Sequence, residues 1–162
     1  MDFAKSQQYI AEHKAETIKN ICRFFGADTL LFWSEDSDLS EYQKKYWLPL
    51  LLKLRKEFAL DLPITTDLTL SENAQDIQKF TALLQKMSDK ELTGCFLAAA
   101  ELKSVLLGLL LSKQKIGAAE AFQAAYLEEI YQNKFWGEDA AALNARQKSK
   151  EILESIEGYL KS

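Results

Sequence analysis

Leu92-Thr-Gly-Cys-Phe-Leu-Ala-Ala-Ala-Glu-Leu-Lys-Ser-Val-Leu-Leu-Gly-Leu-Leu-Leu111 is an apolar stretch of about 20 residues, long enough to cross a bilayer as a helix. Glu101 and Lys103 lie within it, however, and each charge would cost about 2.5–3.5 kcal/mol on insertion into a membrane. We therefore interpret the stretch as the central buried helix of a soluble domain, without membrane insertion. Gly108 and the alanines would let neighbouring helices approach it closely.

Helical signals continue on both sides of this stretch. The chain of 162 residues has only two prolines and six glycines to interrupt helices, and its length fits one domain that buries its own core. We expect a helix over about residues 5–24, a helix opened by a Ser40–Gln43 capping box and kinked or restarted at Pro49, and a helix from Asn73 to about Met87. A Ser88–Glu91 capping box then opens the apolar helix, and further helices follow Gly117 and Gly137.

Two short segments have the pattern of β-strands. Residues 29–33 form a brief apolar run, and over residues 62–70 apolar side chains alternate with polar ones or proline. Two short strands do not make a stable sheet alone, so they must pair against helices or complete a larger sheet. The prediction is a mainly α, compact multi-helix domain over residues 1–162. Residues 1–70 hold helices and the two strands, and residues 71–162 form an all-helical core.

The charge and the cysteines exclude some classes of protein. The net charge of −4 argues against a dominant nucleic-acid surface, which usually shows as a basic excess. The short basic run Arg146, Lys148 and Lys150 is interpreted as a solvated helix face. Cys22 and Cys95 lie in apolar helical patterns without metal-ligand spacing, so we expect two reduced, buried thiols.

Little in the sequence is typical of catalysis. His13 is the single histidine, and neither a histidine-based zinc motif nor a glycine-rich phosphate loop is present. Clusters of acidic residues do occur, and we interpret them as solvated loop or helix-start features: Glu35, Asp36 and Asp38; Glu128 and Glu129; Glu138 and Asp139. We expect no enzyme, no catalytic residues, no metal and no cofactor. A hydrolase or metal enzyme built on these acidic clusters remains an alternative.

A second stretch, Leu127-Glu-Glu-Ile-Tyr-Gln-Asn-Lys-Phe-Trp-Gly-Glu-Asp139, combines adjacent acids, an amide, two large aromatic residues and a helix-breaking glycine. A structural helix needs a stop signal, but it does not need this many unusual side chains around it. The segment is therefore either a dense packing corner or a surface that contacts another molecule. If the segment is a packing corner, Trp136 is a core residue that holds the last two helices together.

This stretch resembles the signature of the assembly chaperones of the ATP synthase F-one sector, the "ATP-twelve" family. The matching pattern is Leu127-Glu-Glu-x-Tyr-Gln-x-x-x-Trp-Gly-Glu-Asp139, with Glu128 where the family usually has aspartate. Further segments match in order along nearly the whole chain: Asp28-Thr-Leu-Leu-Phe32, Gln43, Trp47-x-Pro49, Ile64-Thr-Thr66, the run from Ser104 to Leu111, and Glu120-Ala-Phe122. Leu48 and Asp67 depart from the family pattern, which has aspartate and often glycine there. The resemblance implies an N-terminal, strand-containing domain that the 162 residues do not include, so we expect either a trimmed form or a shortened member of the family.

The resemblance implies a dedicated chaperone rather than an enzyme. Family members bind the free α subunit of the catalytic sector and keep it from aggregating until the β subunit joins it. The expected partner is thus the ATP synthase α subunit. We expect a monomer in the bacterial cytoplasm, or in the mitochondrial matrix if the chain is a processed eukaryotic member. A helical adaptor or regulatory protein-binding domain is the alternative.

The residues expected to contact the partner come from the second stretch: Glu128, Glu129, Gln132, Trp136, Glu138 and Asp139. Trp47, Pro49 and Gly137 are expected to have structural roles. Within the stretch, we expect Trp136 and Gly137 to hold the corner in shape while Glu128, Glu129 and Glu138 face the client.

Overall fold

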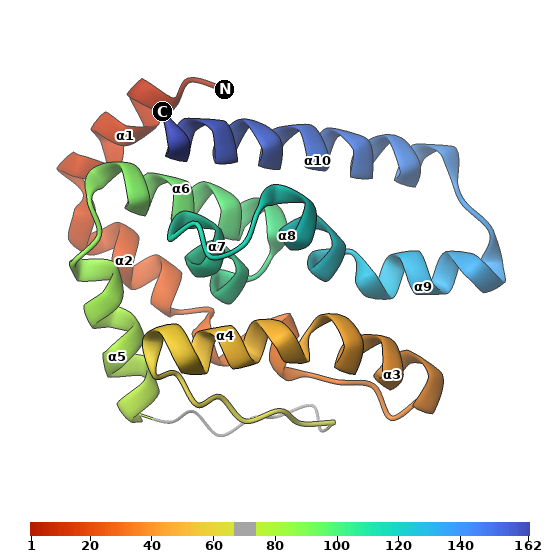
Figure 1. Ribbon diagram of the computed structural model, residues 1–162. Helices are drawn as coiled ribbons and strands as arrows, with labels where there is room; N and C mark the ends of the chain where they lie inside the picture. Colours follow the sequence, from red (N-terminus) through yellow and green to blue (C-terminus); the bar gives the residue numbers. More distant parts are fainter. Residues whose placement is uncertain (67–73) are drawn as a thin grey trace.

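A computed structural model describes residues 1–66 and 74–162 and shows the expected mainly helical fold. The helices are α1 (Phe3–Glu12), α2 (Lys14–Cys22), α3 (Ser37–Tyr46), α4 (Leu48–Phe58), α5 (Ala74–Gln85), α6 (Asp89–Leu102), α7 (Val105–Ser112), α8 (Ala118–Ala125), α9 (Leu127–Trp136) and α10 (Ala140–Lys161), with short 3-10 turns η1 (Phe25–Ala27) and η2 (Thr29–Leu31). Helices α6, α7 and α8 occupy the middle, between α10 on one side and α3 and α4 on the other (Figure 1). None of the helices in the two described ranges is long and apolar enough to span a membrane.

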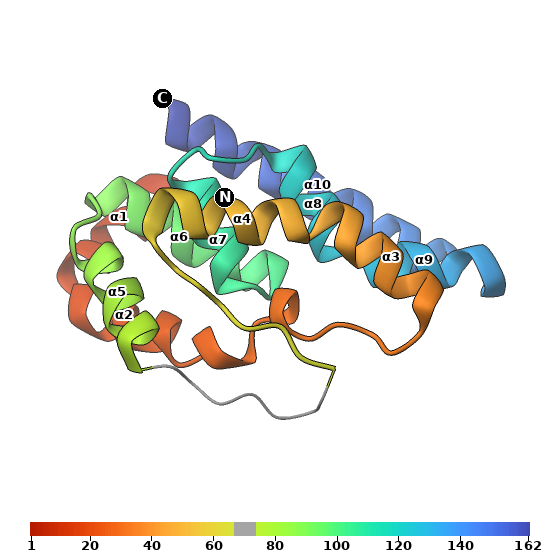
Figure 2. The same ribbon diagram turned by 60° about the horizontal axis from the view of Figure 1, so that its bottom comes forward.

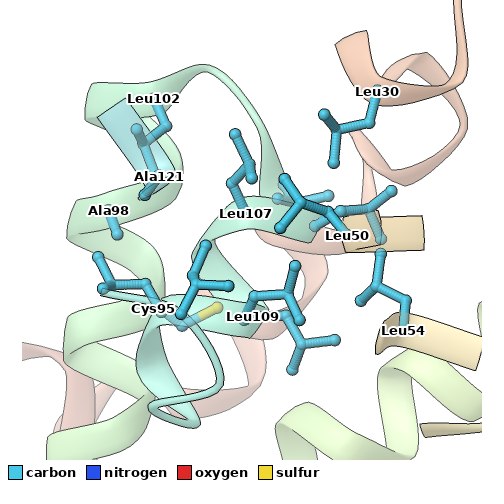
Figure 3. Packing of buried hydrophobic residues seen from close by; sticks show 14 of the residues in the cluster. Leu30, Leu50, Leu54, Cys95, Ala98, Leu102, Leu107, Leu109 and Ala121 are labelled. Atoms are coloured by element: carbon cyan, nitrogen blue, oxygen red, sulfur yellow. The ribbon is translucent and has the colours of Figure 1, made fainter. Parts of the chain in front are cut away.

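The apolar stretch lies at the centre of the molecule but forms two helices rather than one. Helix α6 ends before Lys103, whose φ of 55° is left-handed, and Ser104 then caps α7 by accepting from the Leu107 N–H. Every residue of α7 is buried. Figure 3 shows Leu107 and Leu109 of α7 between Cys95 of α6 and the leucines of α4. A hydroxyl that caps a new helix competes with continuation of the old one, and here the cap prevails.

The two helices approach each other closely at Gly108. A Cβ atom added there would lie 2.9 Å from the Cys95 carbonyl oxygen and 3.1 Å from Ala99 Cβ. The close approach expected of Gly108 is thus confirmed, and its partner is the helix just before it in the chain.

The carboxyl of Asp28 explains where α7 begins. It accepts from Ser104 Oγ at 2.8 and 2.9 Å, from Leu106 N at 2.9 Å, and from Leu30 N at 3.1 Å. Asp28 is 2% exposed, so these bonds join η2 to the start of α7 inside the protein. Burial raises the pKa of this carboxyl to about 6, against the opposing effect of the donated hydrogen bonds.

The prediction of two strands is wrong for the described residues. Residues 29–31 form η2, and a single parallel bridge joins Phe32 to Thr65. Leu30 and Leu31 are both buried, so this segment lacks the alternation of a strand and follows the turn that Asp28 caps. Residues 67–70 of the second expected strand, and the expected cap Asn73, lie outside the described residues.

The remaining helix boundaries differ from expectation in part. The first expected helix is divided into α1 and α2 at His13, and Pro49 stands near the start of α4, where a restart was expected. The Ser40–Gln43 capping box does not form, because α3 begins earlier with Asp36 as its cap. The Gln43 side chain is instead buried and accepts from Ser34 N at 2.8 Å.

Trp47 lies in the joint between α3 and α4. It is fully buried, and its Nε1 donates to the Ala124 carbonyl oxygen of α8 at 2.9 Å. A buried indole N–H that finds a partner stabilises one arrangement of the ring. Pro49, two residues on, is exposed. Both cysteines are free thiols: Cys95 is buried as expected, whereas Cys22 is only half-buried.

Candidate functional site

Helix α9 and the turn after it carry the second stretch, and they project at the end of the molecule remote from α1, α2 and α5. Figures 1 and 2 both place α9 between α3 and α10. Leu127 is the one buried residue of α9. Contacts at the two flanks of α9 therefore hold it, rather than an apolar face packed on the core.

Arg146 of α10 makes the contacts on one flank. It is 4% exposed, and it pairs with Glu129 (Nη1 to Oε1, 2.9 Å) and with Glu138 (Nη2 to Oε1, 3.1 Å). With its amide oxygen turned toward α10, Asn133 accepts from both Nη atoms of Arg146, at 2.9 and 3.1 Å. These four residues are called the Arg146 cluster below.

The interpretation of Arg146 as part of a solvated face is therefore wrong, although Lys148 and Lys150 are exposed as expected. The periodicity of the apolar residues in α10 could have indicated that Arg146 is buried. Its buried residues follow spacings of three and four, typical of one helix face: Arg146, Ser149, Leu153, Ile156 and Leu160. A basic residue in line with that stripe has to be buried, and it then needs acidic partners.

Helix α3 makes the contacts on the opposite flank of α9. Gln43 Nε2 donates to Glu128 Oε1 at 3.2 Å. The rings of Tyr42 and Tyr131 meet edge to face at 5.5 Å, and Lys134 Nζ lies 4.1 Å from the centroid of the Tyr42 ring and bonds its hydroxyl. The aromatic contacts continue outward from Tyr131 to Phe135, with ring centroids 5.3 Å apart. Contacts between these aromatic residues and α3 were not predicted from the sequence.

The turn after α9 is formed by the backbone and not by packing of Trp136. Trp136 is 86% exposed, so the expectation that it holds the corner is wrong. Gly137 has φ 78° and ψ 169°, a region that residues with a Cβ rarely enter, and nothing lies within 4 Å of where a Cβ would stand. Helix α10 begins at Ala140, with Asp139 Oδ1 accepting from Ala141 N at 3.2 Å. Glu138 therefore precedes α10, and Asp139 is the N-cap of that helix.

The residues expected at the partner surface are brought together only in part. Glu128 and Gln132 lie four positions apart along α9 and share a face, on which Phe135, a residue outside the expected set, also lies. Glu129 and Glu138 meet at Arg146, and Asp139 caps α10. The side chains of Gln132 and Trp136 are exposed, and neither makes a hydrogen bond to the described residues. Trp47 and Pro49 belong to the α3–α4 joint and not to this end of α9.

Other parts of the described chain offer little chemistry. A largely apolar cavity of about 310 Å³ lies near the start of α7, lined mainly by Ile21, Phe24, Phe96, Ala99 and Val105. Within residues 1–66 and 74–162, no group of three or more His, Cys, Asp or Glu side chains is placed to hold a metal ion.

Comparison with known proteins agrees with this architecture. No family model matches the chain. Its structure is similar to the crystal structure of Atp12 from Paracoccus denitrificans, with a TM-score of 0.89 and 19% identity over 96% of this chain and 68% of that one. It is also similar to a candidate chaperone from Agrobacterium tumefaciens, with a TM-score of 0.83 and 23% identity over 93% of this chain and 57% of that one. The chain therefore has the fold of Atp12, as the sequence resemblance implied.

Proposed function

We propose that the protein is an assembly chaperone for the catalytic sector of ATP synthase, and that its client is the free α subunit. The observation that carries the proposal is the Atp12 fold, which extends over 96% of the chain. The family pattern in residues 127–139 supports it independently, because the fold comparison does not depend on those side chains. The chain acts as a binding protein and not as an enzyme, in the cytoplasm of a bacterium, as a monomer.

The exposed end of α9 has the composition that such a role requires. A subunit that awaits its partner exposes apolar surface that an obligate interface later buries. A chaperone covers that surface reversibly, with aromatic groups at the centre of the contact and polar groups around it. Trp136 and Phe135 are 86% and 65% exposed, and the side chains of Glu129 and Glu138 in the same segment are half-exposed. We assign client contact to Glu128, Glu129, Gln132, Trp136, Glu138 and Asp139.

Aggregation of purified α subunit, followed by light scattering, tests the proposal. The protein should suppress aggregation at near-stoichiometric ratio. Trp136→Ala should weaken suppression about tenfold or more, because exposed tryptophans at interface centres often carry much of the binding energy. Phe24→Ala is the matched control, since Phe24 is 59% exposed on another part of the surface. Unimpeded aggregation in the presence of the native protein would contradict the proposed function. Equal effects of Trp136→Ala and Phe24→Ala would contradict the proposed site.

The helical adaptor is distinguished by its target. A chaperone for a free subunit loses its site when the partner subunit takes its place, whereas an adaptor binds the assembled sector as well as the free subunit. Pull-down of the assembled catalytic sector as efficiently as of the free α subunit would therefore favour the adaptor.

A further inference from the structure

The segment that carries the proposed client surface is buried only at its two ends, and between them α3 and α10 contact α9 from its two flanks. Between Leu127 and Arg146 no residue is buried, although the segment contains all of α9 after its first residue, the Gly137 turn and the first turns of α10. Leu127 fixes the beginning of the segment, and Arg146 is the first buried residue after it. Such a segment has little apolar burial of its own to hold it in one position.

The Arg146 cluster joins three points of this segment to one guanidinium. Glu129 lies near the start of α9, Asn133 lies one turn further along, and Glu138 follows the Gly137 turn. The planar guanidinium, with several donors in fixed directions, reaches all three at once. A lysine would supply the charge as a single point on a flexible stem.

We propose that Arg146 is a positioning residue for the client-binding surface: it fixes α9 and the Gly137 turn against α10, without itself contacting the client. The inference rests on the proposed function for what the surface binds. Arg146 is 4% exposed and sits beneath the carboxylates that it orients, so it is out of reach of a partner. Each carboxylate uses Oε1 for Arg146, and its other oxygen makes no bond to a described residue. One cation facing two half-exposed carboxylates leaves a net negative charge at the surface.

The rest of α10 does not depend on this contact. Leu153, Ile156 and Leu160 are buried at 0%, 0% and 6% exposure, and they hold the later turns of α10 on the core. Loss of Arg146 should therefore loosen α9 and the Gly137 turn on the side that faces α10, while the contacts between α3 and α9 remain and the body of the protein stays folded.

The test compares Arg146→Met and Arg146→Lys with the control Lys148→Met, which changes an exposed residue two positions away. Amide hydrogen exchange is measured in α9 and, for reference, in α6, and binding to purified free α subunit is measured on the same samples. In Arg146→Met, protection of α9 should fall about ten- to hundredfold, as expected for lost charge-assisted bonds. Protection of α6 should change little, and binding should weaken in parallel with α9 protection. Arg146→Lys should lie between Arg146→Met and the native protein, and Lys148→Met should match the native protein.

The outcomes separate this inference from the function on which it rests. Unchanged α9 protection in Arg146→Met, or lowered protection with undiminished binding, would overturn the positioning role. Failure of the native protein to bind the α subunit would overturn the proposed function, while the exchange data would still decide whether Arg146 holds α9. If Arg146→Met does not fold, Glu138→Gln removes one charge of the cluster at a half-exposed position. That variant should lower α9 protection and client binding together, and no change in either would again overturn the inference.

Discussion

Asp28 shows how one side chain decides the path of the chain. Its carboxyl accepts the N–H groups at the start of η2 and of α7, and the Ser104 hydroxyl as well. A negative group at a helix N-terminus is favoured by the helix dipole, but burial opposes ionisation of the carboxyl. The balance raises its pKa from 3.8 to about 6. The residue therefore connects stability to pH in a range in which few other carboxyls titrate.

The sign of this pH dependence follows from proton linkage. A carboxyl whose pKa is higher in the folded state binds its proton more tightly there than in the unfolded chain. Its contribution to stability is thus fully present below about pH 4 and is lost as the pH rises through about 6. Asp28→Asn lacks this titration. The free energy of unfolding of the native protein minus that of Asp28→Asn should fall by about 3 kcal/mol at most between about pH 4 and 7. Urea unfolding of both proteins across this range measures the difference, and a difference that is constant or rises with pH would contradict the assignment.

Trp136 and Arg146 show where residue-level reading of the sequence fails. Tryptophan is usually buried and arginine usually exposed, yet here Trp136 is 86% exposed and Arg146 is 4% exposed. The stripe from Arg146 to Leu160 could have revealed the buried arginine. The sequence leaves Trp136 open between a packing role and contact with a partner, because its exposure depends on how far α9 extends beyond its neighbours.

At the scale of elements, the close contact between α6 and α7 depends on Gly108. A methyl group there would meet the backbone oxygen of Cys95 at 2.9 Å and the backbone nitrogen of Ala99 at 3.1 Å, and backbone atoms cannot turn aside as a flexible side chain can. The two helices form the centre of the core, so moving them apart would disturb the packing of the side chains around them.

Gly108→Ala should therefore lower the free energy of unfolding by about 1–3 kcal/mol through overpacking. Gly158→Ala is the matched control, because nothing lies within 4 Å of a Cβ at that position in α10. Removing a helical glycine without a clash should raise stability by up to about 1 kcal/mol. Thermal or urea unfolding of both variants checks the pair. A Gly108→Ala protein as stable as Gly158→Ala would contradict the packing described for α6 and α7.

The elements also show which local patterns decide structure and which do not. The Ser88–Glu91 capping box forms at the start of α6, because both of its hydrogen bonds lie within one turn. The expected strand at residues 29–33 does not form, because Asp28 caps a 3-10 turn there with the help of Ser104, which lies 76 positions away in the chain. Contacts of that range cannot be read from local spacing.

At the scale of the whole molecule, the protein consists of a packed helical body and of helix α9, in which only Leu127 is buried. The body is built around α6 and α7, and α9 lies at its far end with the family pattern on it (Figure 1). The helical class and the central place of the apolar stretch were predictable, because periodicity and composition determine them. The break at Ser104 was not predicted, because it depends on Asp28, which lies far away in the chain. The Arg146 cluster was not predicted, because Arg146 was interpreted as part of a solvated face and not as part of the buried stripe of α10.

The assignment of the client is the central claim, and titration calorimetry with purified subunits tests it most directly. The protein is titrated separately with free α subunit and with free β subunit of ATP synthase. The account predicts saturable binding to the α subunit and no binding to the β subunit. Binding to the β subunit alone, or to neither subunit, would contradict it.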